Sequence, residues 1–177
     1  YRKKVLELFN AASTENDLKW GAWAGEWGSA YTKAQTTTGL TWLRNHGLHV
    51  RGHVLVWPGW RNLPASIQAL RGTARQGEVP ARALEHIEEI VGATRDLVEE
   101  WDVLNEPYAN HDLMDLFGAA IQTDWFKAAR ATHAKAPLYL NDYSNHDAAL
   151  DSGHVAHFET TARYLKNQGA PIGGLGL

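Results

Sequence analysis

The sequence predicts an α/β protein built on a parallel β-sheet, and three observations lead to this fold class. Short apolar runs typical of strands alternate along the chain with longer stretches of helical periodicity, and such alternation gives parallel strands joined by helical crossovers. The run at residues 49–58 is almost continuously apolar, like a strand buried on both faces. Several strands end in reactive side chains, which favours part of a (β/α)8 barrel over a doubly wound sheet. A doubly wound nucleotide binder would also need a phosphate loop, and neither GxGxxG nor GxxxxGK[ST] occurs.

Length and composition describe an ordinary globular domain. The chain has 177 residues, 44% of them hydrophobic and 21% charged, so we expect one domain over residues 1–177. The net charge of −3 indicates no nucleic-acid partner and no membrane partner. Cysteine is absent, which excludes disulfides and thiolate metal ligands. The chain opens on Tyr1 without a visible signal peptide, so we expect a processed or excised piece.

The N-terminal residues predict a short helix and then a strand. An imperfect apolar face indicates a helix over residues 2–9, and small residues indicate a strand over 9–14. Residues 15–20 then hold four polar side chains. They are either the first turn of a helix capped by Thr14 or a polar wall beside a hydroxyl-rich ligand.

The middle of the chain predicts three helices around one strand. Apolar positions recur over residues 31–46, which a glycine ends, and a short helix is expected over 63–71. A longer helix over 80–98 has apolar residues at spacings near 3.6. The strand lies between the first two of these helices and covers residues 49–58.

Residues 100–107 form the segment on which the predicted function depends most. An apolar run ends in Asn105, Glu106 and Pro107. Since Pro107 cannot donate to a sheet ladder, the strand must stop there and leave Glu106 at its C-terminal tip. Active sites of α/β barrels and open α/β sheets lie at this end of the strands. The simpler alternative is an acid that merely faces solvent.

The last part of the chain continues the alternation. One or two helices are expected from Asp112 through Ala129, and residues 137–143 form a strand that again ends in polar side chains. A helix over 151–168 and a strand over 172–177 complete the pattern.

Eight tryptophans are an unusual feature of so short a chain. Several lie in glycine-rich stretches, at residues 19–27 and 57–60, which indicates loops. Tryptophans on loops suit the C–H face of a sugar ring, with ordinary packing as the alternative. Trp42, Trp101 and Trp125 fall in helix or strand patterns, and we assign them to the core.

The strand tips and the loops after them bring carboxyl, amide, lysine and histidine side chains together with tryptophan. Such a set suits a ligand rich in hydroxyl groups, and a carboxyl among them suits general acid catalysis at a glycosidic oxygen. A metal site is not expected, because the histidines are scattered and no HExxH occurs. Ser–His–Asp chemistry is not expected either, because no GxSxG occurs.

Five ordered segments resemble family 10 of the glycoside hydrolases, the retaining endo-β-1,4-xylanases. The similar segments are TENDLKW at residues 14–20, RGHVLVW at 51–57, WDVLNE at 101–106, LYLNDY at 138–143 and IGGLGL at 172–177. In the family they belong to strands two to six, so the resemblance implies a partial barrel that lacks strands 1, 7 and 8.

The resemblance implies roles at the point of cleavage. Glu106 would be the general acid/base, which protonates the leaving oxygen and then deprotonates water. Asn105 would bind the 2-hydroxyl of the sugar there, His53 would bind the same sugar, and Trp57 would pack beneath it.

Further implied contacts lie on either side. Glu15, Asn16 and Lys19 would hold the next sugar on the non-reducing side, and Tyr143 would stack on the leaving-group side. The implied partner is xylan or a xylo-oligosaccharide, with no cofactor, and the implied location is extracellular or periplasmic.

The matched pattern also has departures and a gap. Pro58, Pro107 and the tryptophan-rich stretch at residues 20–28 differ from the common family pattern, so the exact polysaccharide stays open. A retaining mechanism needs a second carboxylate about 5–5.5 Å from the first. The family places it on strand seven, beyond Leu177, so we expect this chain alone to be inactive. We also expect self-association through unpaired sheet edges. The alternatives are a non-catalytic carbohydrate-binding or inhibitor-like barrel and a retaining glycosidase of another β-glucan.

Overall fold

A computed structural model describes residues 2–144 and 151–177 of the chain. Its centre is a parallel sheet of five strands in the order β1-β2-β3-β4-β5. The strands are β1 (Ala11–Ser13), β2 (His49–Gly52), β3 (Glu100–Asn105), β4 (Leu138–Asn141) and β5 (Gly174–Gly176). Each strand pairs with the next one in the chain, so the sheet lacks the reversal of strand order that defines a doubly wound fold. The predicted arc of a (β/α)8 barrel is therefore confirmed.

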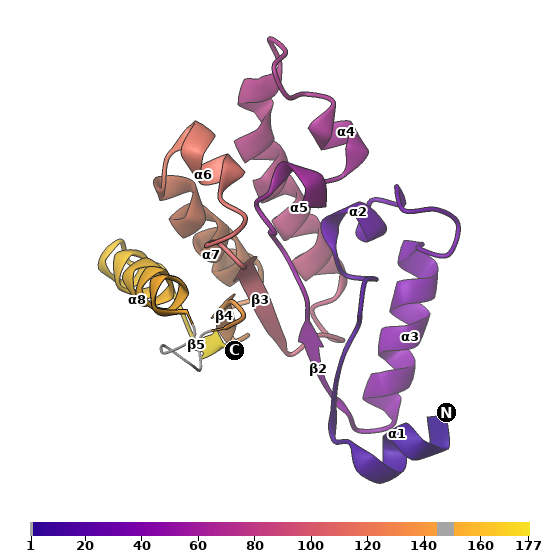
Figure 1. Cartoon of the computed structure of the whole chain (residues 1–177). Helices are drawn as coiled ribbons and strands as arrows, with labels where there is room; N and C mark the ends of the chain where they lie inside the picture. Colours follow the sequence, from indigo (N-terminus) through magenta and orange to yellow (C-terminus); the bar gives the residue numbers. More distant parts are fainter. Residues whose placement is uncertain (1, 145–150) are drawn as a thin grey trace.

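Helices connect the strands and lie around one side of the sheet (Figure 1). They are α1 (Arg2–Leu8), α2 (Trp20–Trp23), α3 (Lys33–Asn45), α4 (Ala65–Gln68), α5 (Val79–Ala93), α6 (Asp112–Phe117), α7 (Ala120–Thr132) and α8 (Ser152–Asn167), with 3₁₀ turns at Trp60–Asn62 and Gln76–Glu78. The alternation read from the sequence is thus confirmed. None of the helices in the described residues is long and apolar enough to cross a membrane.

The hydrophobic core lies between the sheet and these helices. Trp101 of β3, Ile90 of α5, and Trp125 and Phe126 of α7 are all at most 1% exposed. Burying a side chain of this size contributes roughly 1.5–3 kcal/mol each. Gly52 of β2 is part of the same packing, because a Cβ there would lie 2.3 Å from a ring carbon of Trp101.

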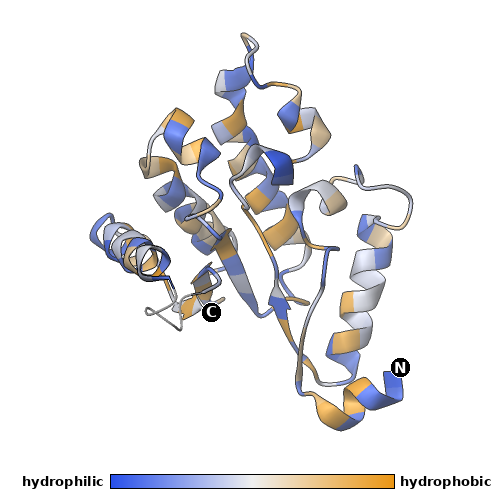
Figure 2. Ribbon diagram, viewed as in Figure 1, coloured by the Kyte–Doolittle hydropathy of each residue, from blue (hydrophilic) through white to orange (hydrophobic). Residues whose placement is uncertain are grey.

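The opposite, concave face of the sheet is polar. Hydrophilic bands interrupt the hydrophobic ones along β3 (Figure 2). A register shift between Asp102 and Leu104 inserts one extra residue, Val103, opposite β4. Asp102 pairs with Tyr139 before this bulge and Asn105 pairs with Asn141 after it. The bulge therefore lets side chains three residues apart face the same side.

The expectation of one strand over residues 49–58 is wrong in its second half. β2 ends at Gly52, the peptide bond that follows His53 is cis, and Val56 meets the sheet again through a single bridge to Leu104. From Gly52 to Val56 the chain advances four residues, while its partner advances three from Trp101 to Leu104. This mismatch in length interrupts the ladder.

Three other local expectations are corrected. The helix expected over residues 80–98 ends at Ala93, because the backbone of Thr94, with φ of −113° and ψ of 11°, leaves the helical conformation. Thr14 caps no helix, because residues 15–19 form turns and α2 begins only at Trp20. Trp42 is half-buried on α3, where its ring lies against Arg2 and His46 rather than in the core.

Candidate active site

Glu106 occupies the first position after β3, at the C-terminal end of the parallel strands. Its backbone has φ of 51°, a left-handed conformation that residues other than glycine seldom adopt. Its N–H donates to the Asn141 carbonyl at 2.8 Å, and the next residue, Pro107, is buried. A non-glycine residue persists in this conformation when its surroundings enforce it, and such residues cluster at functional sites.

Two side chains hold the Glu106 carboxylate. The indole N–H of Trp57 donates to Oε2 at 3.1 Å, and Nδ2 of Asn110 donates to the same oxygen at 3.3 Å. Asn110 is buried and also donates to the Glu106 carbonyl, also at 3.3 Å. Glu106 is half-buried, so the carboxyl is orientated by neighbours while remaining in reach of solvent.

The turn before α2 extends this site. Nζ of Lys19 lies 5.3 Å from the centre of the Trp57 ring and donates to Oδ1 of Asn16 at 2.9 Å. Asn16 in turn donates to the Tyr31 hydroxyl at 3.4 Å. Glu15 is exposed beside them in the same turn. A cation, an amide and aromatic rings thus continue the wall that begins at Glu106.

His53 stands on the concave face and is held by a buried carboxylate. Its Nδ1 lies 2.9 Å from Oδ2 of Asp102, while Nε of Arg51 donates to Oδ1 at 3.0 Å. Burial by itself disfavours the Arg51 cation, but the hydrogen bond and charge of Asp102 outweigh it and raise the pKa of Arg51. Asp102 therefore fixes both basic side chains.

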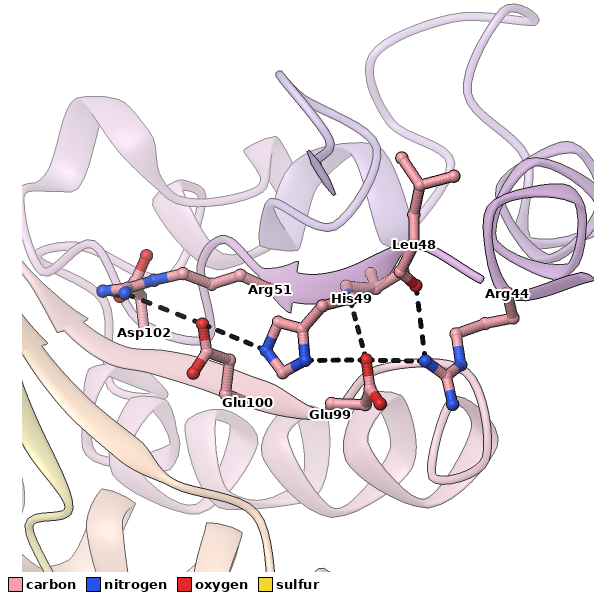
Figure 3. A network of polar contacts seen from close by, with 8 residues as sticks. Arg44, Leu48, His49, Arg51, Glu99, Glu100 and Asp102 are labelled. Carbon is pink, nitrogen blue, oxygen red and sulfur yellow. Dashed lines mark hydrogen bonds and ion pairs between the residues drawn. The ribbon is translucent and has the colours of Figure 1, made fainter. Parts of the chain in front are cut away.

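The polar network continues from Asp102 toward the start of the strands (Figure 3). His49 lies between two carboxylates, 2.9 Å from Glu99 and 3.4 Å from Glu100, and Arg44 is 2.6 Å from Glu99. Burial and the hydrogen bond to Glu100 raise the pKa of Tyr139. These contacts tie β2, β3 and β4 together below the site.

The remaining predicted residues are Asn105, at the end of β3, and Tyr143, two residues after β4. Asn105 is fully buried, with its Oδ1 accepting from Nδ2 of Asn141 at 2.7 Å, whereas Tyr143 is 48% exposed. Asp142 is buried with His154 of α8, whose Nε2 lies 2.8 Å from Oδ1. The aromatic ring of Tyr143 rests edge-on against His154, with centroids 4.6 Å apart. Asn141 and Asp142 thus make structural contacts within the fold.

Most of the loop tryptophans are not surface platforms. Trp20, Trp23 and Trp60 are 8%, 2% and 7% exposed and belong to the hydrophobic core. Trp20 stacks on His86 at 4.7 Å, and Trp23 donates to Glu89 at 2.7 Å. Their partners come from α5, which a local sequence window cannot contain. Of the tryptophans in those two stretches, Trp27 is exposed and Trp57 is half-buried.

The sequence reading missed three residues of the site. Asp102 had a detectable signal, because a charged residue at strand spacing from Glu100 marks the polar face of an otherwise apolar strand. Tyr31 was placed inside a helix, but α3 begins two residues later. Asn110 lies in a loop, where no periodicity marks it. The described residues contain no group of three or more His, Asp or Glu placed to hold a metal ion.

Comparison with known proteins identifies the family of this chain. The sequence profile of glycosyl hydrolase family 10 matches residues 1–177. The chain belongs to this family. It is 28% identical over 189 residues to a β-1,4-xylanase of Dictyoglomus thermophilum and 30% identical over 178 residues to endo-1,4-β-xylanase 3 of Hypocrea jecorina.

The structural likeness covers the same region. The crystal structure of xylanase XynB from Paenibacillus barcinonensis in complex with a conduramine derivative matches with a TM-score of 0.81 and 28% identity. The match covers 98% of this chain and 54% of that protein. The chain likewise spans 49% and 46% of the two family-10 relatives, about half their length.

Proposed function

We propose that the protein carrying this chain is a retaining endo-β-1,4-xylanase and that Glu106 is its general acid/base. The observation that carries the proposal is the setting of the Glu106 carboxylate. Trp57 and Asn110 donate hydrogen bonds to it at the strand tip, and Lys19 and Asn16 lie next along the same row of contacts. A carboxyl flanked by aromatic and amide groups suits protonation of a glycosidic oxygen. Because xylan is a polymer outside the cell, the proposal also places the protein outside the cytoplasm.

The contacts suggest how the site works. Glu106 donates its proton to the leaving oxygen and then takes one from the water that completes hydrolysis. The two donors on Oε2 fix the plane of the carboxyl, so that the acid need not reorientate during the reaction. His53, orientated by Asp102, meets the sugar at the point of cleavage together with Asn105, and Trp57 lies beneath it.

The groups beyond the point of cleavage bind neighbouring sugars. Lys19, Asn16 and Glu15 offer donors and acceptors to the next sugar on the non-reducing side. Tyr143, half-exposed beyond β4, offers a ring on the leaving-group side.

The second carboxylate of the mechanism is not supplied by this chain under the proposal. Three acids on the concave face or at its rim are engaged already: Asp102 with Arg51 and His53, Glu100 with His49 and Arg51, and Asp142 with His154. A retaining enzyme needs a free carboxylate about 5–5.5 Å from the acid. The chain alone should therefore hydrolyse xylan negligibly.

A substrate panel tests the proposal. The full-length protein should release reducing sugar from β-1,4-xylan in preference to cellulose and mixed-linkage β-glucan, with retention of anomeric configuration by NMR. Preference for another β-glucan would replace xylan as the substrate. Inversion, or xylan turnover by this chain alone at the rate of a complete enzyme, would contradict the mechanism.

A second candidate is carbohydrate binding without hydrolysis. It is favoured by the same engagement of the three acids, since none of Asp102, Glu100 and Asp142 is left free to act as a nucleophile beside the groups for sugar contact. Retardation of the full-length protein in xylan-containing gels, without any release of reducing sugar, would favour this function over the first.

A further inference from the structure

A line of contacts leads away from the Glu106 carboxylate. It passes from Trp57 to Lys19, from Lys19 to Asn16 and from Asn16 to the Tyr31 hydroxyl. The line then goes one step further, because the Tyr31 ring meets the ring of Trp27 edge-on at 6.1 Å. Trp27 thus lies at the outer end of the row that starts at the acid.

Trp27 differs from its buried neighbours in the same stretch. It is 39% exposed, whereas Trp20 and Trp23 are 8% and 2% exposed. One part of its indole rests on α2, since a Cβ at Gly21 would lie 2.2 Å from Trp27 Nε1. A ring supported from below and at its edge, with surface left open, has the form of a stacking platform.

The loop that carries Trp27 is anchored to a neighbouring helix through the side chain of Glu26. Gly25 and Gly28 flank the residue and have φ of 75° and 97°, conformations that a side chain would disfavour. Next to Trp27, Glu26 accepts from the Ser66 N–H at 3.0 Å and from the Ser66 hydroxyl. The loop is therefore fixed to the start of α4, and little order has to be gained on binding a ligand.

We propose that Trp27, supported by Tyr31, forms an outer subsite for a third sugar on the non-reducing side. The inference rests on the proposed function, which places the first sugar over Trp57 and the second beside Asn16 and Lys19. The ligand is a β-1,4-linked chain of neutral pyranoses, because an aromatic face binds the C–H face of such a ring without requiring charge. Trp27 then determines a preference for longer chains and takes no part in bond cleavage.

Calorimetric titration of this chain with xylobiose, xylotriose and xylotetraose tests the subsite. For the native chain, affinity should rise by roughly 2- to 10-fold from xylobiose to xylotriose, the range of one aromatic contact. Trp27→Ala should remove this rise and leave xylobiose binding unchanged, while Trp27→Tyr should retain most of it. Phe9→Ala is the matched control, because Phe9 is 62% exposed and follows α1, at the opposite end of the β1 segment from α2 (Figure 1).

The outcomes separate this inference from the function on which it rests. If affinity rises with chain length equally in the native chain and Trp27→Ala, or if Trp27→Ala weakens all three ligands alike, the subsite is wrong and the proposed function stands. If the native chain binds none of the oligosaccharides, the sugar site itself is wrong and the subsite goes with it. If Trp27→Ala fails to fold, the lack of any rise with Trp27→Tyr overturns the subsite.

Discussion

The indole N–H of Trp57 donates a hydrogen bond to the Glu106 carboxylate at 3.1 Å. The two residues are 49 positions apart in the chain: Trp57 follows the bridge residue Val56, and Glu106 follows the last residue of β3. The same indole also faces the Lys19 ammonium, 5.3 Å from its ring centre. Trp57 thus joins the acid to the wall that continues toward the non-reducing side.

Removing the acid should separate the two steps of hydrolysis. In the full-length enzyme, Glu106→Ala should abolish turnover of xylan and spare part of the turnover of aryl xylosides whose leaving groups need no protonation. Trp57→Phe keeps the ring and loses one hydrogen bond to a charged group, worth about 1.5–3 kcal/mol, so its rate should fall roughly 10- to 100-fold. Steady-state kinetics on both substrates measures this. Unchanged xylan turnover in Glu106→Ala would remove Glu106 from the mechanism.

Asp102 should matter for stability as well as for His53. Asp102→Ala leaves Arg51 without its main partner and should lower the free energy of unfolding by about 2–4 kcal/mol, toward the lower end because the Arg51 side chain is 28% exposed. Urea denaturation measures the change. The control is Glu159→Ala, whose ion pair with Arg163 is exposed on α8 and whose loss should cost no more than about 0.5 kcal/mol. Equal effects of the two substitutions would argue against a structural role for Asp102.

Two glycines offer a matched pair of substitutions. Gly52→Ala places a methyl group 2.3 Å from the Trp101 ring and should destabilise the fold by about 1–3 kcal/mol through overpacking. Gly39→Ala, inside α3 with nothing within 4 Å of the new methyl group, should stabilise it by roughly 0.5–1 kcal/mol. Thermal unfolding of both variants gives the comparison, and a stable Gly52→Ala would mean that Trp101 packs elsewhere.

His86 should make the fold sensitive to acid. Burial is the main cause that lowers its pKa from 6.5 to about 3; a hydrogen bond with the Leu55 backbone opposes the shift, and the Lys33 charge adds to it. Between these values the unfolded chain binds a proton that the folded chain does not, so stability is lost as pH falls. At pH 5 the loss is about 2 kcal/mol. His86→Phe keeps an aromatic partner for Trp20 and should reduce the loss between pH 7 and pH 5. An identical pH dependence in both proteins would contradict this.

The sheet edges should promote association of this chain. β1 and β5 are the two edge strands, and Leu175 and Leu177 at the second edge are 52% and 77% exposed. Unpaired, apolar edges recruit further strands, so sedimentation should show oligomers that grow with concentration. Leu175→Lys should shift the distribution toward monomer, because a charge on an edge strand opposes pairing. A native chain that stays monomeric over the concentration range would contradict the prediction.

Local patterns in the sequence anticipated the order of the elements. The apolar run before Asn105 and the proline after Glu106 were enough to predict where β3 ends and which carboxyl stands at its tip. The position of Glu106 relative to Lys19 and Trp57 came from resemblance, since spacing along the chain does not specify how strand tips converge.

What could not be predicted depends on contacts between distant segments. The burial of Trp20 requires His86, 66 positions away, and the early end of β2 follows from its mismatch in length with β3 between Gly52 and Val56. A glycine-rich stretch and an apolar run predict a loop and a long strand when they are read alone. Tertiary packing overrides both.

Under the proposed function, different β/α units of the barrel carry different parts of the active site, and this has a practical consequence. Under the proposed function, the acid and the groups that grip the non-reducing end sit on consecutive β/α units of this one chain, and the nucleophile belongs to other units. A hybrid barrel that joined this chain to complementary units of another family-10 enzyme would take its selectivity for oligomer length from here. The rate at which the hybrid forms the covalent intermediate would be set by the enzyme that supplies the other units, because those units carry the nucleophile.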